Sequence, residues 1–131
     1  MLKIKITKKE SAVAVIIRED DSILLLKRPN WVDWSPGLWA FPGGKVEDDE
    51  GAKEAAVRET KEETQLEILN LQVVPIYTDK PVATYYTRDY TGAVKIDWEH
   101  DDWAWVHRKE LHKYEVAPQV EETYEWVLEN G

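Results

Sequence analysis

Three glutamates stand close together in one segment of the chain, at a spacing that suits one side of a helix. At 100° per residue, Glu59, Glu62 and Glu63 continue an apolar stripe that begins at Ala52 and ends at Leu66. Like charges at this spacing repel one another, and turning them toward the protein adds a desolvation cost unless a cation lies among them. The same projection places these polar positions on the opposite side: Lys53, Glu54, Arg58, Lys61, Thr64 and Gln65.

A divalent metal ion is the simplest counter-charge for such a cluster. Mg²⁺ and Mn²⁺ take oxygen ligands and are often held by a few carboxylates together with substrate phosphates. The cluster contains no histidine or cysteine, which fits a hard cation. The plainer interpretation is an acidic helix face turned to solvent, which the inward direction of the stripe and a preceding pair of glycines both oppose.

The loop and the ends of this helix have recognisable signals of their own. Residues 42–44, Pro-Gly-Gly, predict a turn at which the backbone approaches a metal or a phosphate closely. The helix is expected over residues 52–64, with Gly51 as a permissible N-cap. Gln65 stands where a glycine would let the chain turn left-handed, so it either carries that strain or ends the helix differently.

The segment from Gly44 to Leu66 resembles the Nudix box, the signature loop and helix of the Nudix (MutT-like) hydrolases. Five residues separate Gly44 from Glu50, and seven more precede the pair Arg58-Glu59. The pair Glu62-Glu63 and an aliphatic residue then complete the pattern, and residues 38–42 (Leu-Trp-Ala-Phe-Pro) extend it at the front. Gln65 departs from the family pattern, which usually has glycine there.

The resemblance implies a set of metal ligands. In the family, the box binds divalent metals around a diphosphate, and water attacks one phosphorus to release a nucleotide or phosphate product. Glu59, Glu62 and Glu63 resemble the carboxylate ligands, with Glu59 also similar to a proposed base, and the Gly43 carbonyl resembles a backbone ligand. An acidic residue from a later loop serves other members as ligand or base; Glu99 is the best match here, and its neighbours Asp101 and Asp102 are alternatives.

A supporting pair and the substrate contacts follow from the same comparison. Arg58 and Glu50 resemble the pair that braces the loop and helix, whereas the plainer interpretation of Arg58 is an exposed helical arginine. Lys27, Arg28 and Lys45 are candidates for substrate phosphates. Because side chains alternate along a strand, Lys27 and Arg28 should not both face the site, and Arg28 is preferred.

Gly44 and several aromatic residues are further candidates for contacts with the substrate. Gly44 would let the backbone approach a phosphate. Tyr85 is a candidate for the base, and further aromatic candidates are Trp31, Trp34, Tyr86 and Trp98, although core or rim packing is the plainer interpretation of each. The three histidines receive no role.

Composition limits what else the protein does. A chain of 131 residues predicts one domain over residues 1–131. Its net charge of −9 argues against binding a nucleic-acid polymer, and without cysteine it has no disulfide or thiolate site. It has no signal-peptide pattern and no long apolar run, so a soluble cytoplasmic protein that does not contact membranes is expected. The oligomeric state is open, with a homodimer as one alternative.

The remaining pattern predicts a mixed sheet between helices. Strands 12–17 and 23–28 read as a hairpin, and a long C-terminal helix follows Pro118. The arrangement agrees with the α/β/α sandwich that the Nudix resemblance implies. The other expected elements are strands 2–8, 38–41, 67–77, 82–86, 95–98 and 103–106, turns 19–22 and 89–92, and a short helix 109–114.

The resemblance points to a metal-dependent hydrolase of a nucleoside diphosphate linked to another group. Nucleoside triphosphates, including oxidised ones, are the first expectation, because short single-domain members with this entry to the box resemble that branch. ADP-ribose and dinucleoside polyphosphates are the alternatives, from Pro81 at 15 residues beyond Leu66 and from Tyr85. A catalytically inactive nucleotide-binding module is a further alternative, against which the complete set of box carboxylates argues.

Overall fold

The central strands bury side chains on both of their faces, and this divides the core in two. In the computed structural model, which describes residues 8–131, β1 spans Ser11–Ile16 and β2 spans Ile23–Lys27. Side chains alternate along a strand. Ala12, Ala14 and Ile16 therefore join one buried cluster, whereas Val15 and Ile17 join the other.

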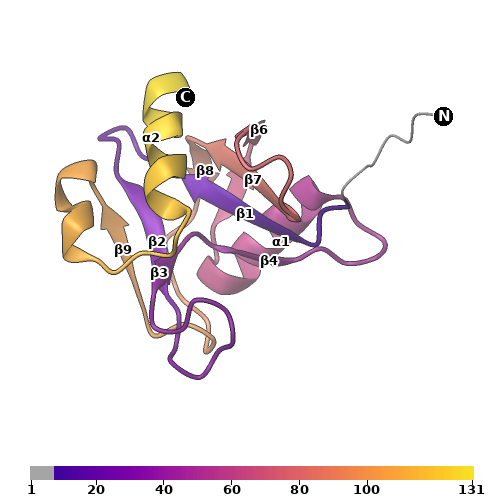
Figure 1. Ribbon diagram of the computed structural model, residues 1–131, viewed down its shortest axis with the longest axis horizontal. Helices are drawn as coiled ribbons and strands as arrows, with labels where there is room; N and C mark the ends of the chain where they lie inside the picture. The colour runs from indigo at the N-terminus through magenta and orange to yellow at the C-terminus, as the bar shows by residue number, and fades with distance from the viewer. Residues whose placement is uncertain (1–7) are drawn as a thin grey trace.

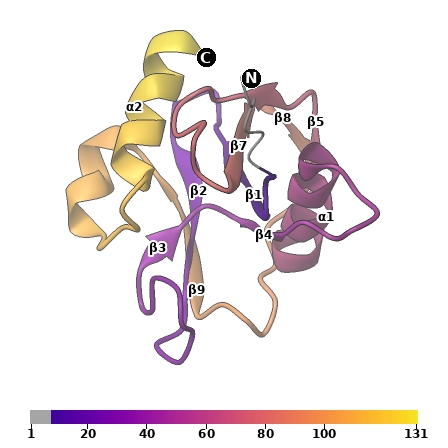
Figure 2. The same cartoon turned by 45° about the vertical axis from the view of Figure 1, so that its right-hand side comes forward.

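One helix covers each cluster, as Figure 2 shows with the strands between α1 and α2. Helix α1 (Ala52–Thr64) contributes Ala55 and Ala56 to the cluster of Ala12 and Ala14. Helix α2 (Val120–Asn130) contributes residues at steps of three and four, Val120, Tyr124 and Val127, to the other cluster. The predicted α/β/α sandwich with a C-terminal helix is confirmed.

The sheet is mixed, as predicted. Strand β1 lies parallel to β7, with Ser11 opposite Val82, and antiparallel to β4, with Val13 opposite Gly43. The strand orders are β4-β1-β7-β6, β3-β2-β9 and β5-β8 (Figure 1). The remaining elements are β3 (Trp39–Ala40), β4 (Gly43–Lys45), β5 (Glu67–Leu69), β6 (Gln72–Val73), β7 (Val82–Thr87), β8 (Asp89–Thr91), β9 (Asp102–Val106) and the 3₁₀ helix η1 (Arg108–Lys113).

The predicted hairpin of strands 12–17 and 23–28 is wrong. A single isolated bridge joins Ile17 to Ile23 beyond the turn, after which the strands separate. Both edges of β1 are taken by β4 and β7, and β2 pairs instead with β3 and β9. A strand has two hydrogen-bonding edges, so long-range pairing displaced the local one.

The predicted turn at residues 42–44 is also wrong, because Gly43 and Gly44 belong to β4. The two glycines have a different use there. A Cβ on Gly43 would lie 2.3 Å from the carbonyl oxygen of Ala12 and 2.7 Å from the Cα of Val13. Only glycine lets β4 lie this close to β1, and the backbone of the box is thereby fixed to the centre of the sheet.

The end of α1 confirms the left-handed alternative for Gln65. Its φ is 66°, and its N–H donates to the carbonyl of Lys61 at 3.0 Å. The chain then runs into β5, and Asn70, with φ of 55°, interrupts the long strand predicted over residues 67–77. The predicted turn 89–92 is wrong, because Asp89–Thr91 form β8 against β5.

The segment predicted as strand 95–98 follows the end of α1 instead of joining a sheet. The Lys95 N–H donates to the carbonyl of Thr64 at 2.9 Å, and the Asp97 N–H donates to that of Glu63 at 3.1 Å. These bonds use helix carbonyls that have no partner within α1 and hold the acidic loop beside the glutamates. The predicted strand 2–8 lies outside the described residues except for its last position, and within residues 8–131 no helix is long and apolar enough to cross a membrane.

Candidate active site

Glu63 is the most enclosed carboxylate of the site. It lies in the last turn of α1 and is 4% exposed. Its Oε1 accepts a hydrogen bond of 2.8 Å from the Gly43 N–H in β4. Burial, with the nearby carboxylates of Glu59, Asp97 and Glu99, raises the pKa of Glu63 to about 9, against the single lowering effect of the Gly43 N–H. Burial thus disfavours the charged form of Glu63, and the neighbouring carboxylates add to this effect.

Glu59 lies one turn earlier in α1 and packs against the glycine loop. A Cβ on Gly44 would lie 2.5 Å from the Glu59 carboxylate carbon, so the backbone of β4 passes directly over this group. Burial raises the pKa of Glu59, which hydrogen bonding and charge from Arg58 partly offset. The side chains of Glu59 and Glu63 thus point toward the protein, as predicted.

Glu62 points elsewhere, and the predicted helix projection is wrong there. Its side chain is 56% exposed, and Thr64, which was expected on the outer side, is buried. Thr60 and Thr64 take the inner positions because the buried stripe continues from Ala56 in steps of four. Glu62 therefore lies at the open rim of the site, beside Arg58.

Arg58 links the loop before α1 to the carboxylates on the helix. Its guanidinium donates to both carboxylate oxygens of Glu50, at 2.7 and 3.1 Å, and to the backbone carbonyl of Lys45 at 3.0 Å. It also donates to Glu59 at 2.8 Å and to Glu62 at 3.3 Å. Hydrogen bonds, first that from Arg58 and then that from the Glu47 N–H, lower the pKa of Glu50. The interpretation of Arg58 as an isolated surface arginine does not fit these contacts.

His100 and Asp97 are site residues that the sequence did not identify. The His100 side chain is 6% exposed, with Nδ1 2.8 Å from Asp97 Oδ1 and Nε2 3.7 Å from Glu63 Oε2. The loop that carries Glu99 thus encloses Glu63 from the side opposite β4. The only sequence signal was that His100 directly follows Glu99 in the acidic loop, whereas Asp97 stood in the segment predicted as strand 95–98.

A cavity of about 390 Å³ opens over these carboxylates. Glu59, Glu63, Glu99, Arg28 and Lys45 all line it. Neither Lys27 nor the alternatives Asp101 and Asp102 is among the residues that line it, and the preference for Arg28 and Glu99 agrees with this placement.

Arg28 is oriented by the tryptophan loop. Its Nε donates to the Trp34 carbonyl at 2.7 Å, and its guanidinium carbon lies 5.0 Å from the centre of the Trp34 ring. Burial lowers the pKa of Arg28, while the charges of Glu63 and Glu99 act in the opposite direction. Its charge is therefore held near the carboxylates by a fixed side chain.

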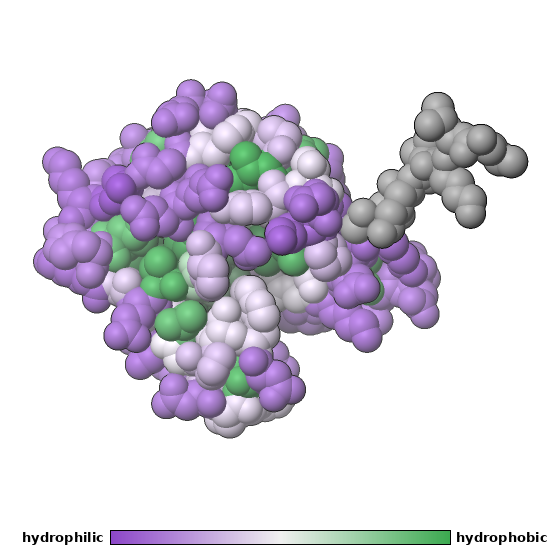
Figure 3. Space-filling model, viewed as in Figure 1, coloured by the Kyte–Doolittle hydropathy of each residue, from purple (hydrophilic) through white to green (hydrophobic). Residues whose placement is uncertain are grey.

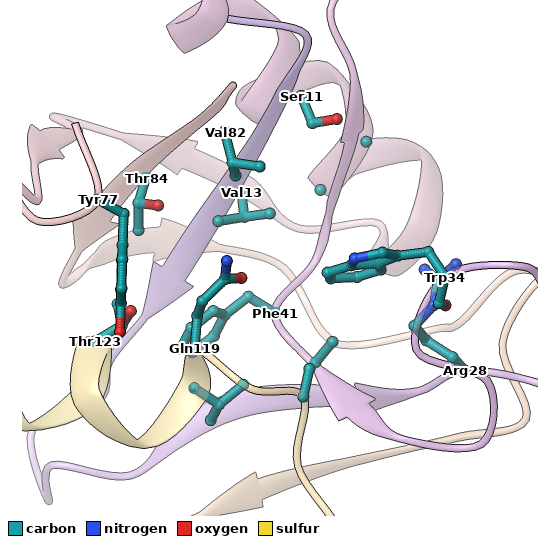
Figure 4. Close-up of a pocket in the computed structure, with 15 residues that line it drawn as sticks. Ser11, Val13, Arg28, Trp34, Phe41, Tyr77, Val82, Thr84, Gln119 and Thr123 are labelled. Atoms are coloured by element: carbon teal, nitrogen blue, oxygen red, sulfur yellow. The ribbon is translucent and has the colours of Figure 1, made fainter. Parts of the chain in front are cut away.

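A second cavity, of about 290 Å³, lies on the α2 side of the sheet (Figure 4). Val13, Phe41 and Trp34 give it apolar walls, and Gln119 and Thr123 add polar groups from the start of α2. The two cavities share Arg28, Gly43 and Gly44. A ligand that fills the apolar cavity would thus reach the carboxylates across the glycines.

Tyr85 does not line either cavity. It is 9% exposed and belongs to the cluster under α1, whereas its neighbour Thr84 faces the α2 side and lines the apolar cavity. Successive side chains of β7 point to opposite faces, and this alternation takes Tyr85 away from the candidate substrate cavity. The expectation that it stacks on a base is therefore corrected to a role in core packing.

The donor groups fit a hard divalent cation. Within residues 8–131 no three carboxylate or imidazole groups already enclose a metal site, and the Arg58 guanidinium contacts both Glu59 and Glu62. The carboxylates of Glu59, Glu63 and Glu99 nevertheless offer oxygen donors to one cavity. A bound cation would favour the charged form of Glu63, whose pKa is raised first by burial and then by the neighbouring carboxylates.

The fold and the site together define an α/β/α protein with a cavity lined by carboxylates from helix α1 and from the loop before β9. The chain belongs to the Nudix hydrolase family, because the family model of the NUDIX domain matches residues 8–127. Members of this family act on phosphoric anhydrides and generally need divalent metal ions.

Three relatives illustrate the similarity. The chain is 35% identical over 112 residues to the CTP pyrophosphohydrolase of Escherichia coli K12, covering 81% of this chain and 82% of that protein. It is 29% identical to the nucleoside triphosphatase NudI of Escherichia coli strain UMN026, over 88% of this chain and 94% of NudI. The crystal structure of a MutT NUDIX hydrolase from Burkholderia pseudomallei has the same fold, with a TM-score of 0.76, 23% identity and coverage of 92% and 98%.

Proposed function

We propose that this protein is a divalent-metal-dependent pyrophosphohydrolase of nucleoside triphosphates, including oxidised ones, and that residues 1–131 form a single Nudix domain. The observation that carries the proposal is that an apolar cavity with a polar rim adjoins a carboxylate cluster across two shared glycines. A base would occupy the cavity under α2, and the polyphosphate would pass Gly43 and Gly44 to reach Glu59. The CTP pyrophosphohydrolase and nucleoside triphosphatase activities in the names of its relatives support this substrate class.

The proposed reaction is hydrolysis of one phosphoric anhydride bond. The oxygen of a water molecule forms a bond to phosphorus, the bridging P–O bond breaks, and the products are a nucleoside monophosphate and pyrophosphate. One proton of the water passes to a carboxylate, for which Glu59 is the candidate base. Glu59, Glu62, Glu63, Glu99 and the Gly43 carbonyl are the proposed ligands for Mg²⁺ or Mn²⁺, which would neutralise phosphate charge and lower the pKa of the bound water.

The other groups position these carboxylates and the substrate. Arg58 and Glu50 are proposed to brace the loop against the helix, because Arg58 contacts Glu50, Glu59 and Glu62 together. Arg28 and Lys45 line the carboxylate cavity with positive charge and are proposed to contact phosphates. The close packing of Gly44 on Glu59 supports a backbone contact with the anhydride.

A panel of substrates tests the proposal. Purified protein is incubated with CTP, dGTP, 8-oxo-dGTP or ADP-ribose, with Mg²⁺ or with EDTA, and the products are separated by chromatography. We expect monophosphate and pyrophosphate from at least one triphosphate only when Mg²⁺ is present. Cleavage of ADP-ribose at ten times the kcat/KM of every triphosphate would refute the substrate class, and absence of all turnover would support the inactive nucleotide-binding module.

A further inference from the structure

Two exposed indoles face each other across the mouth of the carboxylate cavity. Trp31 lies in the loop between β2 and β3, and Trp98 lies in the loop between β8 and β9; these loops meet at the lower end of the molecule in Figure 1. The side chains are unusually open for tryptophan, at 66% and 80% exposed. Their rings are nearly parallel, with 8° between the planes and 6.4 Å between the centroids.

This geometry leaves aromatic surface uncovered. Carbon atoms in contact lie about 3.5–4.0 Å apart, so two indoles in full face-to-face contact would have much closer centroids. At 6.4 Å, the rings of Trp31 and Trp98 form a loose stack, and both side chains keep most of their surface exposed. A large exposed apolar group is the informative exception on a protein surface, and two aligned ones make a platform for a flat ring. The surface over these loops is paler than the purple parts around it in Figure 3.

The platform belongs to the same cleft as the carboxylates. Trp31 and Trp98 line the cavity that Glu59 and Glu63 also line, and that cavity shares Gly43 and Gly44 with the apolar cavity under α2. The carboxylates therefore lie between two places that suit a planar ring. One is enclosed by the sheet and α2, and the other is open and formed by the two indoles.

The negative charge of the two loops favours an uncharged base over a phosphate as the ligand of the two indoles. Asp33 and Asp101 lie in these loops with exposed side chains, whereas the positive groups that line the cavity are Arg28 and Lys45. A terminal phosphate at the indoles would be repelled by the carboxylates of Asp33 and Asp101, whereas an uncharged base would not be repelled. Stacking on tryptophan also tolerates every base, because each has an aromatic face.

We propose that Trp31 and Trp98 bind the second base of a dinucleoside polyphosphate. This inference rests on the proposed function, in which the first nucleoside fills the cavity under α2 and the anhydride lies at Gly44 and Glu59. The second base then stacks on the indoles at the outer end of the cleft. The enzyme thus accepts substrates with an aromatic group at each end of the phosphate chain, as well as triphosphates.

A kinetic preference tests the proposal. The kcat/KM for diadenosine tetraphosphate is divided by the kcat/KM for ATP in the wild type, Trp31→Ala, Trp98→Ala and Trp98→Tyr. Stacking of a base on an aromatic side chain predicts that either alanine variant lowers this ratio about tenfold, mainly through KM for the dinucleotide, and that tyrosine restores most of it. Trp103→Ala is the matched control, because Trp103 is 38% exposed on β9 and lines neither cavity.

A binding measurement without turnover separates this inference from the proposed function. In EDTA, diadenosine tetraphosphate should shift the indole N–H signals of Trp31 and Trp98 in ¹⁵N-¹H spectra, and ATP should shift them less. Equal shifts with ATP, no shifts, or an unchanged kinetic ratio in both alanine variants would overturn the platform while leaving triphosphate hydrolysis intact. If the wild type cleaves no nucleotide, the proposed function fails, and the spectra alone decide whether the indoles bind the second base.

Discussion

Gly44 lies so close to Glu59 that no side chain fits between them. A Cβ at residue 44 would lie 2.5 Å from the Glu59 carboxylate carbon and an equal distance from its Oε2. Glycine at position 44 allows the backbone of β4 to approach the Glu59 carboxylate; it is not needed for an unusual backbone angle. Strand β4 and helix α1 are therefore packed together, and the backbone of β4 limits where the Glu59 carboxylate of α1 can lie.

Gly44→Ala should displace Glu59 and lower Mg²⁺-dependent hydrolysis about 10²-fold, because a misplaced catalytic group costs roughly that much. The far-UV circular dichroism should stay unchanged, since the clash is with the end of a side chain. Gly51→Ala is the matched control, because a Cβ there would meet only Glu54 Oε1, at 3.4 Å. Wild-type kcat/KM in Gly44→Ala would show that the position of Glu59 does not matter.

Glu63 should make the metal-free protein less stable as the pH rises. Burial raises its pKa from 4.5 to about 9, so the folded state keeps a proton that the unfolded chain releases. The stabilising contribution of this proton is fully present below pH 4.5 and is lost as the pH rises toward about 9. Glu63→Gln, which stays neutral, should therefore raise Tm in EDTA at pH 8 and have little effect near pH 4.5.

Thermal unfolding in EDTA across this pH range checks the expectation. Glu129→Gln, an exposed change on α2 with the same loss of charge, is the control. Mg²⁺ should raise the Tm of the wild type more than that of Glu63→Gln. A wild-type Tm that changes with pH no more than that of Glu63→Gln would contradict the raised pKa.

Glu62 should matter for activity but not for stability. Its side chain is 56% exposed and contacts only Arg58 among the described groups, so Glu62→Gln should change Tm little. If it ligates the cation, the same change should lower kcat/KM about 10²-fold. Glu54→Gln on the same helix is the control, since glutamine keeps the oxygen that faces the Gly51 N–H. Loss below about tenfold in Glu62→Gln would remove Glu62 from the ligand set.

Arg58→Ala should destabilise the fold and lower activity together. The variant leaves the Glu50 carboxylate, which lies 2.7 Å from the guanidinium in the wild type, without its charged hydrogen-bond partner. Arg58→Lys keeps the charge but not the planar fork, so it should recover only part of the loss. Urea unfolding and kcat/KM measured on both variants check this, and a lysine variant equal to the wild type would show that charge alone suffices.

Gln65→Gly should raise stability by about 1 kcal/mol, because a non-glycine residue at positive φ is strained. The φ of 66° at Gln65 places it in that region. Thermal unfolding should show a small rise in Tm, with hydrolysis unchanged. Gln65→Ala keeps the strain and should show no such rise, and a lower Tm for Gln65→Gly would mean that the glutamine side chain makes a stabilising contact.

The sequence determined the parts of this protein that depend on neighbours along the chain. Helix α1 follows from spacings within one segment, and the same segment offered a left-handed end at Gln65 as one of two alternatives. The inward direction of Glu59 and Glu63 also follows from these spacings, because residues four apart on a helix share a face. The apolar run of residues 12–17 likewise predicted a strand, which the structure contains as β1.

The tertiary structure decided what depends on which segments meet. Gly43 and Gly44 pair with β1 instead of turning, and the pairing of β1 with β7 takes Tyr85 to the α1 side. His100 reaches Glu63 because the chain before it hydrogen-bonds to the end of α1. These contacts join residues far apart in sequence, and local periodicity carries no information on which strand edge or helix end another segment will occupy.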